Sequence, residues 1–405
     1  MGVARGAAGV GLVLVSIAGC QSESVTPAGE NEDKKKAAAA TLAIAPAEGG
    51  KARTDRGVTV RAAGGKVQRV QVRTGKYRLA GKTDRAGTTW RSKWALHPGR
   101  RYTVTAVAVN ADGRRTTKTA RFTTAKPKRT ITAKVTPGDG LLMPGAGKSY
   151  GVGMPIMVDF STAVPNRKAV EKSFEVRAEK PVEGAWHWLN RRQAIFRTKK
   201  YWPRDQKVEF TAHLAGVRAG KGLYGTRNVT SGFTIGDRQV LTVNTKTHQS
   251  VFKRNGKKKR KMAISAGRGT DRSTTTTNGI HLAMSREYHV VMDSTTIGIP
   301  KGRPGYYRLD VNYAVRISDS GEYTHSAPWS VGSQGAANVS HGCVNLSPSN
   351  AKWWYDRAQL GDIVKITGTK RDLEVDNGWG FWQSDWDDWV KGGALDEPVT
   401  PAKLN

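Results

Sequence analysis

The sequence predicts a mainly β protein of several domains, and three observations support that class. Short runs of β-branched and aromatic residues recur between Gly, Asp and Asn residues through most of the 405-residue chain. Between residues 41 and 125, no stretch of about 12 residues or more has the 3.6-residue apolar period of a helix. At roughly 150 residues per domain, the length predicts two to four domains.

The composition narrows the class of protein. Lys and Arg total 66 against 33 Asp and Glu, which gives a formal charge of +33. So large a positive charge indicates anionic partners: nucleic acid, an acidic membrane face or an anionic wall polymer. Apolar residues make up 38%, which suffices for several small cores but excludes a polytopic membrane protein. With only two cysteines, Cys20 and Cys343, a disulfide scaffold is excluded as well.

Residues 1–20 resemble a lipoprotein signal peptide. Arg5 precedes an apolar run over residues 7–19, which is too short to span a bilayer but suits the hydrophobic region of an export signal. The run ends in Ile-Ala-Gly before Cys20, a pattern similar to the lipobox of bacterial lipoproteins. This resemblance implies cleavage before Cys20 and lipidation of its thiol. An ordinary signal peptide that happens to contain a cysteine is the alternative.

Residues 21–40 lack aromatic residues and any apolar period, so we expect a disordered tether. Together the two segments predict an extracytoplasmic protein that is lipid-anchored to the cell membrane and faces the cell wall. Export argues against nucleic acid as the partner of the positive charge. Anionic wall polymers remain as a possible partner that would bind weakly and in a salt-dependent way.

Residues 41–126 predict a first β-sandwich. The β-prone runs 102–109 and 116–122 flank residues 110–113, Asn-Ala-Asp-Gly, which is the pattern of strand, tight turn and strand. The length of the segment and its turn signals suit an immunoglobulin-like fold.

Residues 127–237 predict a second immunoglobulin-like β-sandwich, with strands near 154–160 and 207–213 and one short helix at 166–172. Scattered aromatic residues usually fill cores, and a carbohydrate platform is the alternative. The aromatic residues expected in the core or at an interface are Trp186, Trp188, Phe196 and Trp202. Neither sandwich carries a catalytic pattern, so both are interpreted as spacers.

A basic run, Gly-Lys-Lys-Lys-Arg-Lys at residues 256–261, follows Asn255. It could be read as a nuclear-type basic motif. Because Asn-Gly is a strong hairpin signal and β-like runs flank it, we predict a solvated hairpin tip.

The residues that carry chemistry lie in two short motifs, His-Ser-Ala-Pro-Trp at 325–329 and Val-Ser-His-Gly-Cys-Val-Asn-Leu at 339–346. A free thiol in an exported protein is vulnerable to oxidation, so its presence calls for a use. We favour nucleophilic catalysis, in which an imidazole generates a thiolate and Gly342 lets backbone amides face an oxyanion. A metal site is disfavoured, because it would need more ligands than these motifs supply. An inert buried cysteine is the remaining alternative.

The two motifs resemble the signature of the L,D-transpeptidases, cysteine enzymes that crosslink bacterial peptidoglycan. The resemblance covers residues 238–369, and in actinobacterial members two immunoglobulin-like modules precede this region. It implies a β-rich L,D-transpeptidase catalytic domain with few short helices, one of which we expect at residues 347–359. Ser347 or Ser349 is a plausible N-cap of that helix.

The resemblance also implies roles for individual residues. Cys343 would be the nucleophile, His325 its general base, and Ser326 the residue whose backbone carbonyl orients that base. The oxyanion hole would be formed by Gly342, Cys343 and Tyr307. The implied substrate-binding residues are Tyr307, Met292, Trp329, His341 and Asn345.

A lid between two substrate entrances corresponds, by the same resemblance, to residues 292–319. Tyr306 is the alternative to Tyr307 as the tyrosine that faces the pocket. Three further histidines are expected to be structural or exposed: His248, His281 and His289.

The implied reaction begins with a thioester between Cys343 and a tetrapeptide stem, which releases the terminal D-Ala. The amine of a neighbouring stem's diamino acid then attacks the thioester and forms a 3→3 crosslink. No metal or organic cofactor is implied, and carbapenems would be inhibitors. An L,D-carboxypeptidase of the same fold and a non-catalytic wall-binding lipoprotein are the alternatives. A sortase-like enzyme is disfavoured, because it would carry an Arg shortly after the cysteine.

Residues 370–405 form a Trp-rich C-terminal segment. The spacing of Trp382, Trp386 and Trp389 predicts one face of a short helix. We expect these indoles to pack back on the spacer and catalytic domains, and a sugar-binding stripe is the alternative.

Overall fold

The computed structural model describes residues 36–138 and 149–404. The predicted signal peptide, the predicted lipidation site Cys20 and most of the predicted tether lie outside the described residues. Within the described part of the chain, no helix has the length and apolar character needed to cross a bilayer.

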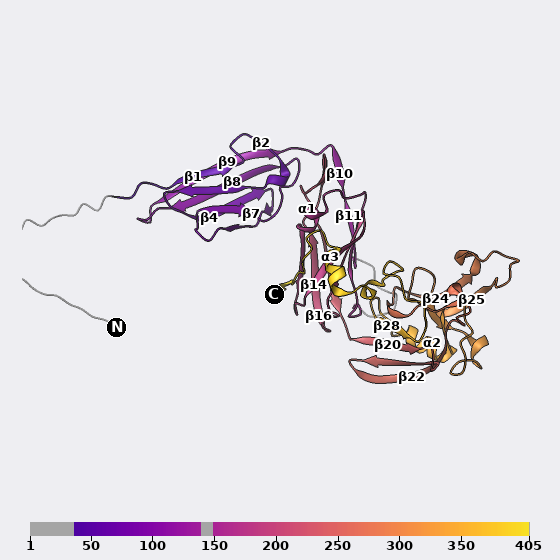
Figure 1. Ribbon diagram of the computed structural model, residues 1–405. Helices are drawn as coiled ribbons and strands as arrows, with labels where there is room; N and C mark the ends of the chain where they lie inside the picture. Colours follow the sequence, from indigo (N-terminus) through magenta and orange to yellow (C-terminus); the bar gives the residue numbers. More distant parts are fainter. Residues whose placement is uncertain (1–35, 139–148, 405) are drawn as a thin grey trace, which may run out of the picture.

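The chain is mainly β, as the sequence predicts, with two sandwiches followed by one large sheet (Figure 1). The second sandwich lies between the first and the large sheet. Short 3₁₀ helices mark several turns: η1 (Thr54–Arg56), η2 (Arg272–Thr274), η3 (Ser294–Ile297), η4 (Pro328–Ser330) and η5 (Phe381–Gln383).

The first sandwich joins a four-stranded and a five-stranded sheet. In sheet order, the strands of the first sheet are β1 (Thr41–Ala45), β3 (Thr59–Ala63), β7 (Thr89–Ser92) and β6 (Gly81–Thr83). Those of the second sheet are β2 (Lys51–Ala52), β9 (Arg115–Thr124), β8 (Arg101–Val109), β4 (Lys66–Thr74) and β5 (Tyr77–Arg78). Every second residue of β8 is buried, which is the period of a strand that covers a core on one face. The predicted turn after Asn110 joins β8 to β9.

The second sandwich has two four-stranded sheets and a small third sheet. One sheet has the order β11 (Ala133–Thr136), β12 (Ile156–Phe160), β15 (Gln193–Thr198) and β14 (Gly184–Asn190). The facing sheet has the order β19 (Val229–Ile235), β16 (Gln206–Ala212), β13 (Phe174–Ala178) and β29 (Ala402–Lys403). The small sheet consists of β10 (Arg129–Ile131), β18 (Leu223–Gly225) and β17 (Arg218–Gly220).

Local chemistry explains two features of this sandwich. The predicted short helix is α1 (Arg167–Glu171), and Asn166 caps it by accepting a hydrogen bond from the Ala169 amide. The four aromatic side chains predicted to pack are all buried: Trp186, Trp188, Phe196 and Trp202. Burial of all four excludes an exposed carbohydrate platform at these positions.

The large sheet has nine strands. Their order is β23 (Gly279–Leu282), β28 (Ile363–Thr367), β20 (Gln239–Asn244), β21 (Gln249–Arg254), β22 (Lys257–Ser265), β27 (Val344–Leu346), β26 (Tyr323–Ser326), β25 (Arg308–Arg316) and β24 (Ser285–Asp293). The predicted hairpin is present, since Asn255 and Gly256 both have positive φ and join β21 to β22. The predicted helix is α2 (Pro348–Tyr355), and the Ser347 hydroxyl accepts the Asn350 amide as its N-cap.

The C-terminal segment returns to the second sandwich, where β29 pairs with β13. The prediction of one helical face for three Trp residues is wrong. Trp382 lies in η5, and the helix α3 (Trp386–Lys391) begins only after a break at Ser384, whose backbone is extended. Trp389 is fully buried against this sandwich and donates its indole N–H to the Ala185 carbonyl at 3.1 Å.

Candidate active site

Sheet order brings the two motifs together. β26 and β27 pair in parallel with His325 opposite Asn345 and Thr324 opposite Val344. Cys343 immediately precedes β27, and its sulfur accepts a hydrogen bond from the Tyr323 backbone amide. Register partners share a face of the sheet, so His325 and Asn345 lie on one face, and Cys343 lies two residues before Asn345.

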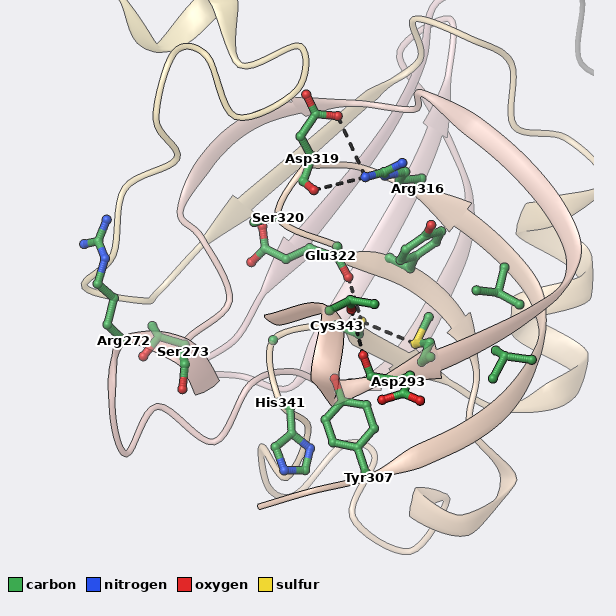
Figure 2. Close-up of a pocket in the computed structure, with 18 of the residues that line it drawn as sticks. Arg272, Ser273, Asp293, Tyr307, Arg316, Asp319, Ser320, Glu322, His341 and Cys343 are labelled. Atoms are coloured by element: carbon green, nitrogen blue, oxygen red, sulfur yellow. Dashed lines mark hydrogen bonds and ion pairs between the residues drawn. The ribbon is translucent and has the colours of Figure 1, made fainter. Parts of the chain in front are cut away.

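Cys343 lies in the wall of a cavity of about 720 Å³. Figure 2 shows it at the centre of the labelled residues, with Tyr307 and His341 below it and Arg316 above it in this view. The Cys343 sulfur lies 3.7 Å from the Gly321 carbonyl oxygen, to which its S–H donates.

Burial decides the resting state of the thiol. It raises the pKa of Cys343 to about 12, and the charge of Glu322 contributes in the same direction, while the Tyr323 amide opposes the shift. The thiolate that the sequence analysis expects therefore has to be generated by the imidazole during the reaction. The sulfur is a neutral thiol until a base removes its proton.

His325 is held in one tautomer. Its Nδ1 lies 2.9 Å from the backbone oxygen of Ser326, and a carbonyl oxygen only accepts, so Nδ1 carries the proton. Nε2 is left with the lone pair that a general base needs. The ring is buried, and burial lowers the pKa of His325 to about 4, so the imidazole is neutral at neutral pH. Ser326 therefore orients the ring through its main chain, as the resemblance implies.

The two side chains are near in the sheet but not joined. Among the described residues, the polar partners of the Cys343 sulfur are the Gly321 carbonyl and the Tyr323 amide, and no hydrogen bond links the sulfur to His325. Proton transfer between them requires the thiol to turn from Gly321 toward β26. Catalytic hydrogen bonds are often long or poorly aligned in substrate-free proteins, and they shorten when substrate binds.

The oxyanion hole differs from the expectation. The Gly342 amide donates to the Ser340 hydroxyl at 3.1 Å, so Gly342 does not offer a free N–H to the cavity. The Ser340 hydroxyl in turn donates to the Cys343 carbonyl at 2.6 Å. Gly342 has φ +133, a conformation that favours glycine, and its carbonyl accepts from Thr276 Oγ1 at 2.6 Å. The glycine shapes the turn before the nucleophile, which leaves the Cys343 amide and Tyr307 as oxyanion candidates.

Three predicted substrate-binding residues lie in the cavity wall: Met292, Tyr307 and His341. The Met292 sulfur lies 4.0 Å from the Cys343 sulfur. The Tyr307 ring packs against the His341 ring with centroids 4.6 Å apart. Burial and the neighbouring Cys343 raise the pKa of Tyr307 to about 12, so its hydroxyl stays protonated and able to donate. Tyr306, the sequence alternative to Tyr307, is not part of this wall.

Trp329 and Asn345 lie outside the wall of this cavity. Asn345 is buried and donates its side-chain amide to the Ser330 hydroxyl at 3.1 Å, which ties β27 to η4. Trp329 is 52% exposed, and its ring centroid lies 6.1 Å from that of His325. Trp329 thus lies beside His325, and neither residue is part of the Cys343 cavity wall.

Sequence reasoning missed six charged residues of the wall. They are Arg272, Asp293, Arg316, Asp319, Glu322 and Arg371. No motif marks them, because they come from separate loops and strand ends that only the folded sheet assembles. Within the described residues, no group of three or more His, Cys, Asp or Glu side chains is placed to hold a metal ion.

Comparison with known proteins gives matches over both halves of the chain. Residues 50–218 match the family model described as bacterial Ig domain, and residues 238–366 match that described as L,D-transpeptidase catalytic domain. L,D-transpeptidase 2 of Mycobacterium tuberculosis is 39% identical over 317 residues, which cover 78% of this chain and 75% of that protein. L,D-transpeptidase 1 of the same species is 39% identical over 232 residues, or 57% of this chain and 86% of that protein. A solved structure of LD transpeptidase LdtMt1 in complex with imipenem is 37% identical with a TM-score of 0.50, covering 60% of this chain and 100% of that chain.

Proposed function

The chain belongs to the L,D-transpeptidase family, and on that premise we propose that it crosslinks peptidoglycan stem peptides through a thioester on Cys343. One observation carries the proposal. A thiol lies in the wall of a cavity, and the neighbouring strand presents an imidazole whose Nε2 is free to accept a proton.

The first half of the reaction acylates the enzyme. A tetrapeptide stem enters the cavity, and its carbonyl before the terminal D-Ala displaces the contact between the thiol and Gly321. The thiol turns to His325, which removes its proton as the sulfur attacks the carbonyl carbon. The Cys343 amide and the Tyr307 hydroxyl stabilise the oxyanion. His325 then gives its proton to the departing amine of D-Ala, and a thioester remains.

The second half transfers the acyl group. The side-chain amine of a neighbouring stem's diamino acid attacks the thioester, while His325 takes a proton from that amine. The sulfur leaves as the new amide forms, and it recovers a proton from His325. The product is a 3→3 crosslink, and no metal or organic cofactor takes part in either half.

A carbapenem would acylate the same sulfur, because its strained lactam carbonyl takes the place of the stem carbonyl. The solved structure of a related LD transpeptidase with imipenem supports this part of the proposal. The motif at Cys20 supports a lipid anchor and an extracytoplasmic location facing the wall, where both stems are found.

The test is incubation of the protein with a purified disaccharide-tetrapeptide, followed by mass spectrometry of both protein and products. We expect an adduct on Cys343 with loss of D-Ala, and dimeric products with a 3→3 link. Cys343→Ala provides the matched control and is expected to give neither. Tripeptide without dimer would instead identify an L,D-carboxypeptidase, and full crosslinking by Cys343→Ala would refute the cysteine mechanism.

A further inference from the structure

Glu322 is a buried charge beside the nucleophile that the reaction above does not use. It is 5% exposed and precedes β26, the strand that carries His325. Burial raises its pKa, but the hydrogen bond and charge of His281 and the hydrogen bonds from Thr277 outweigh this effect and lower it, so Glu322 is ionised at neutral pH. Buried carboxylates are costly unless they are well bonded, so the contacts of Glu322 indicate a use.

Two buried residues hold this carboxylate. The Thr277 amide donates to Glu322 Oε1 at 2.7 Å, and the Thr277 hydroxyl donates to Oε2. Since the hydroxyl's only proton goes to the carboxylate, His281 Nε2, at 2.7 Å, is the donor to Thr277 Oγ1. His281 Nε2 also lies 3.8 Å from Glu322 Oε2. Glu322 therefore has both oxygens fixed by one segment of the large sheet.

The anchored residue stands between the two groups that hold the sulfur. The Gly321 carbonyl accepts the Cys343 thiol at 3.7 Å, and the Tyr323 amide donates to the same sulfur. These are the peptide groups on either side of Glu322. In extended backbone, the carbonyl of one residue and the amide two positions later point the same way, so fixing the residue between them fixes both.

The segment that binds the Glu322 carboxylate also binds the turn before Cys343. The Glu322 side chain borders the space beside Gly342, since a Cβ placed on that glycine would lie 3.9 Å from Glu322 Cγ. Thr276, the neighbour of Thr277, donates to the Gly342 carbonyl at 2.6 Å. One short segment thus holds both Glu322 and the residue before Cys343.

We propose that Glu322 is a positioning residue of this reaction: Thr277 and His281 anchor it, it sets the two peptide groups on the Cys343 sulfur, and its negative charge holds the thiol proton in place until substrate is attacked. The proposal rests on the proposed function for its role in catalysis. A thiol kept neutral between turnovers is also protected from oxidation, which attacks the thiolate.

Other charged and titratable groups face the same cavity, and they bear on any pH measurement. From the strands and loops around it these are Arg272, Asp293, Tyr307, Arg316, Asp319, Tyr323, His341 and Arg371. His325 lies on β26, and His281 lies against the Glu322 carboxylate itself. Glu322 differs from the carboxylates among them in being nearly inaccessible to solvent and adjacent in sequence to both peptide groups that bond the sulfur.

The charge is tested by iodoacetamide alkylation of the full chain between pH 6 and 10, with peptide mapping at Cys343. Glu322→Gln removes the charge but keeps the shape, so we expect alkylation about tenfold faster at each pH below the thiol pKa, equivalent to about one pKa unit. Glu322→Asp keeps the charge and is expected to alkylate more slowly than Glu322→Gln. Equal rates for Glu322→Gln and wild type would overturn the role of the charge. Alkylation needs no stem peptide, so this result is independent of the proposed function.

The anchor is tested by the rate of acylation with tetrapeptide or a carbapenem. Glu322→Asp shortens the side chain and is expected to slow acylation about tenfold, and wild-type acylation by this variant would overturn the positioning role. Thr277→Val serves if the Glu322 variants fail to fold: it is expected to slow acylation about tenfold, with rescue by Thr277→Ser. Equal rates for the Val and Ser variants would reject the anchor. Glu183→Gln changes a half-buried carboxylate of the second sandwich that pairs with Lys199, and it is the matched control for both assays.

Discussion

His325 owes its function to a main-chain contact. Because the Ser326 carbonyl fixes the proton on Nδ1, the ring presents Nε2 as a base, and the serine hydroxyl plays no part in that contact. We predict that His325→Gln lowers the acylation rate by about 10²- to 10⁴-fold, the usual contribution of a general base. Ser326→Ala keeps the carbonyl and is expected to lose less than about tenfold. Single-turnover mass spectrometry with a carbapenem measures both rates, and equal losses would contradict the main-chain role.

The buried imidazole also sets the acid limb of the pH profile. Burial lowers the pKa of His325 to about 4, and only the neutral ring accepts a proton. The acylation rate is therefore expected to hold as the pH falls through the ordinary histidine range near 6.5, and to drop as the pH falls through about 4. Stopped-flow acylation between pH 3.5 and 8 measures this, with circular dichroism at each pH as the folding control. A midpoint near 6.5 would show that the ring is solvated when it acts.

At the residue scale, the sequence identified what a continuous motif contains. Cys343 and His325 lie in the two motifs and Tyr307 is assigned by the family resemblance, and the structure places the cysteine and the tyrosine in one cavity wall. The engagement of the Gly342 amide by Ser340 was not predictable, because a motif does not say which way a backbone N–H points. The role of Glu322 could not be predicted for another reason. Its partners Thr277 and His281 lie 45 and 41 positions upstream, and only the fold brings them to it.

Among the secondary-structure elements, α3 depends on one indole. Trp389 is fully buried and stacks on the His187 ring of β14 with centroids 4.4 Å apart. We predict that Trp389→Ala lowers the free energy of unfolding by about 3 to 5 kcal/mol, as expected for an emptied aromatic site. Trp386→Ala, at a half-buried position of the same helix, is the control and is expected to cost clearly less. Urea denaturation compares the two, and equal losses would mean that helix formation rather than burial is being measured.

The elements that could be predicted from sequence are those with local causes. Asn255-Gly256 and residues 110–113 form the predicted turns because positive φ or a short polar loop is required there. Caps at Asn166 and Ser347 likewise lie next to the helices they start. The prediction of one helix for the three Trp residues is wrong because their spacing does not come from a helical period. The indoles gather around the Arg197 side chain of the second sandwich. A two-residue strand such as β29 has no signal of its own and exists only through its partner.

On the scale of the whole molecule, charge is the dominant property. A formal charge of +33 predicts binding to anionic wall polymers that weakens as salt screens it. We expect retention on purified sacculi to fall about tenfold or more between roughly 50 mM and 500 mM NaCl. Sacculi stripped of their anionic polymers are the control and are expected to retain little protein at either salt. Retention that is independent of salt would show that the charge does not hold the protein to the wall.

The second sandwich is completed by a strand from much later in the chain, because β29 pairs with β13. A ribosome completes residues 127–237 long before it adds Ala402, yet the second sandwich lacks an edge strand until those last residues arrive. The two ends of the catalytic region are thereby fastened to the same spacer, since the segment that enters it follows β19 and the segment that leaves it ends on β13. Truncation after residue 369 would remove β29 and would therefore destabilise the second sandwich, whose other strands end at Ile235.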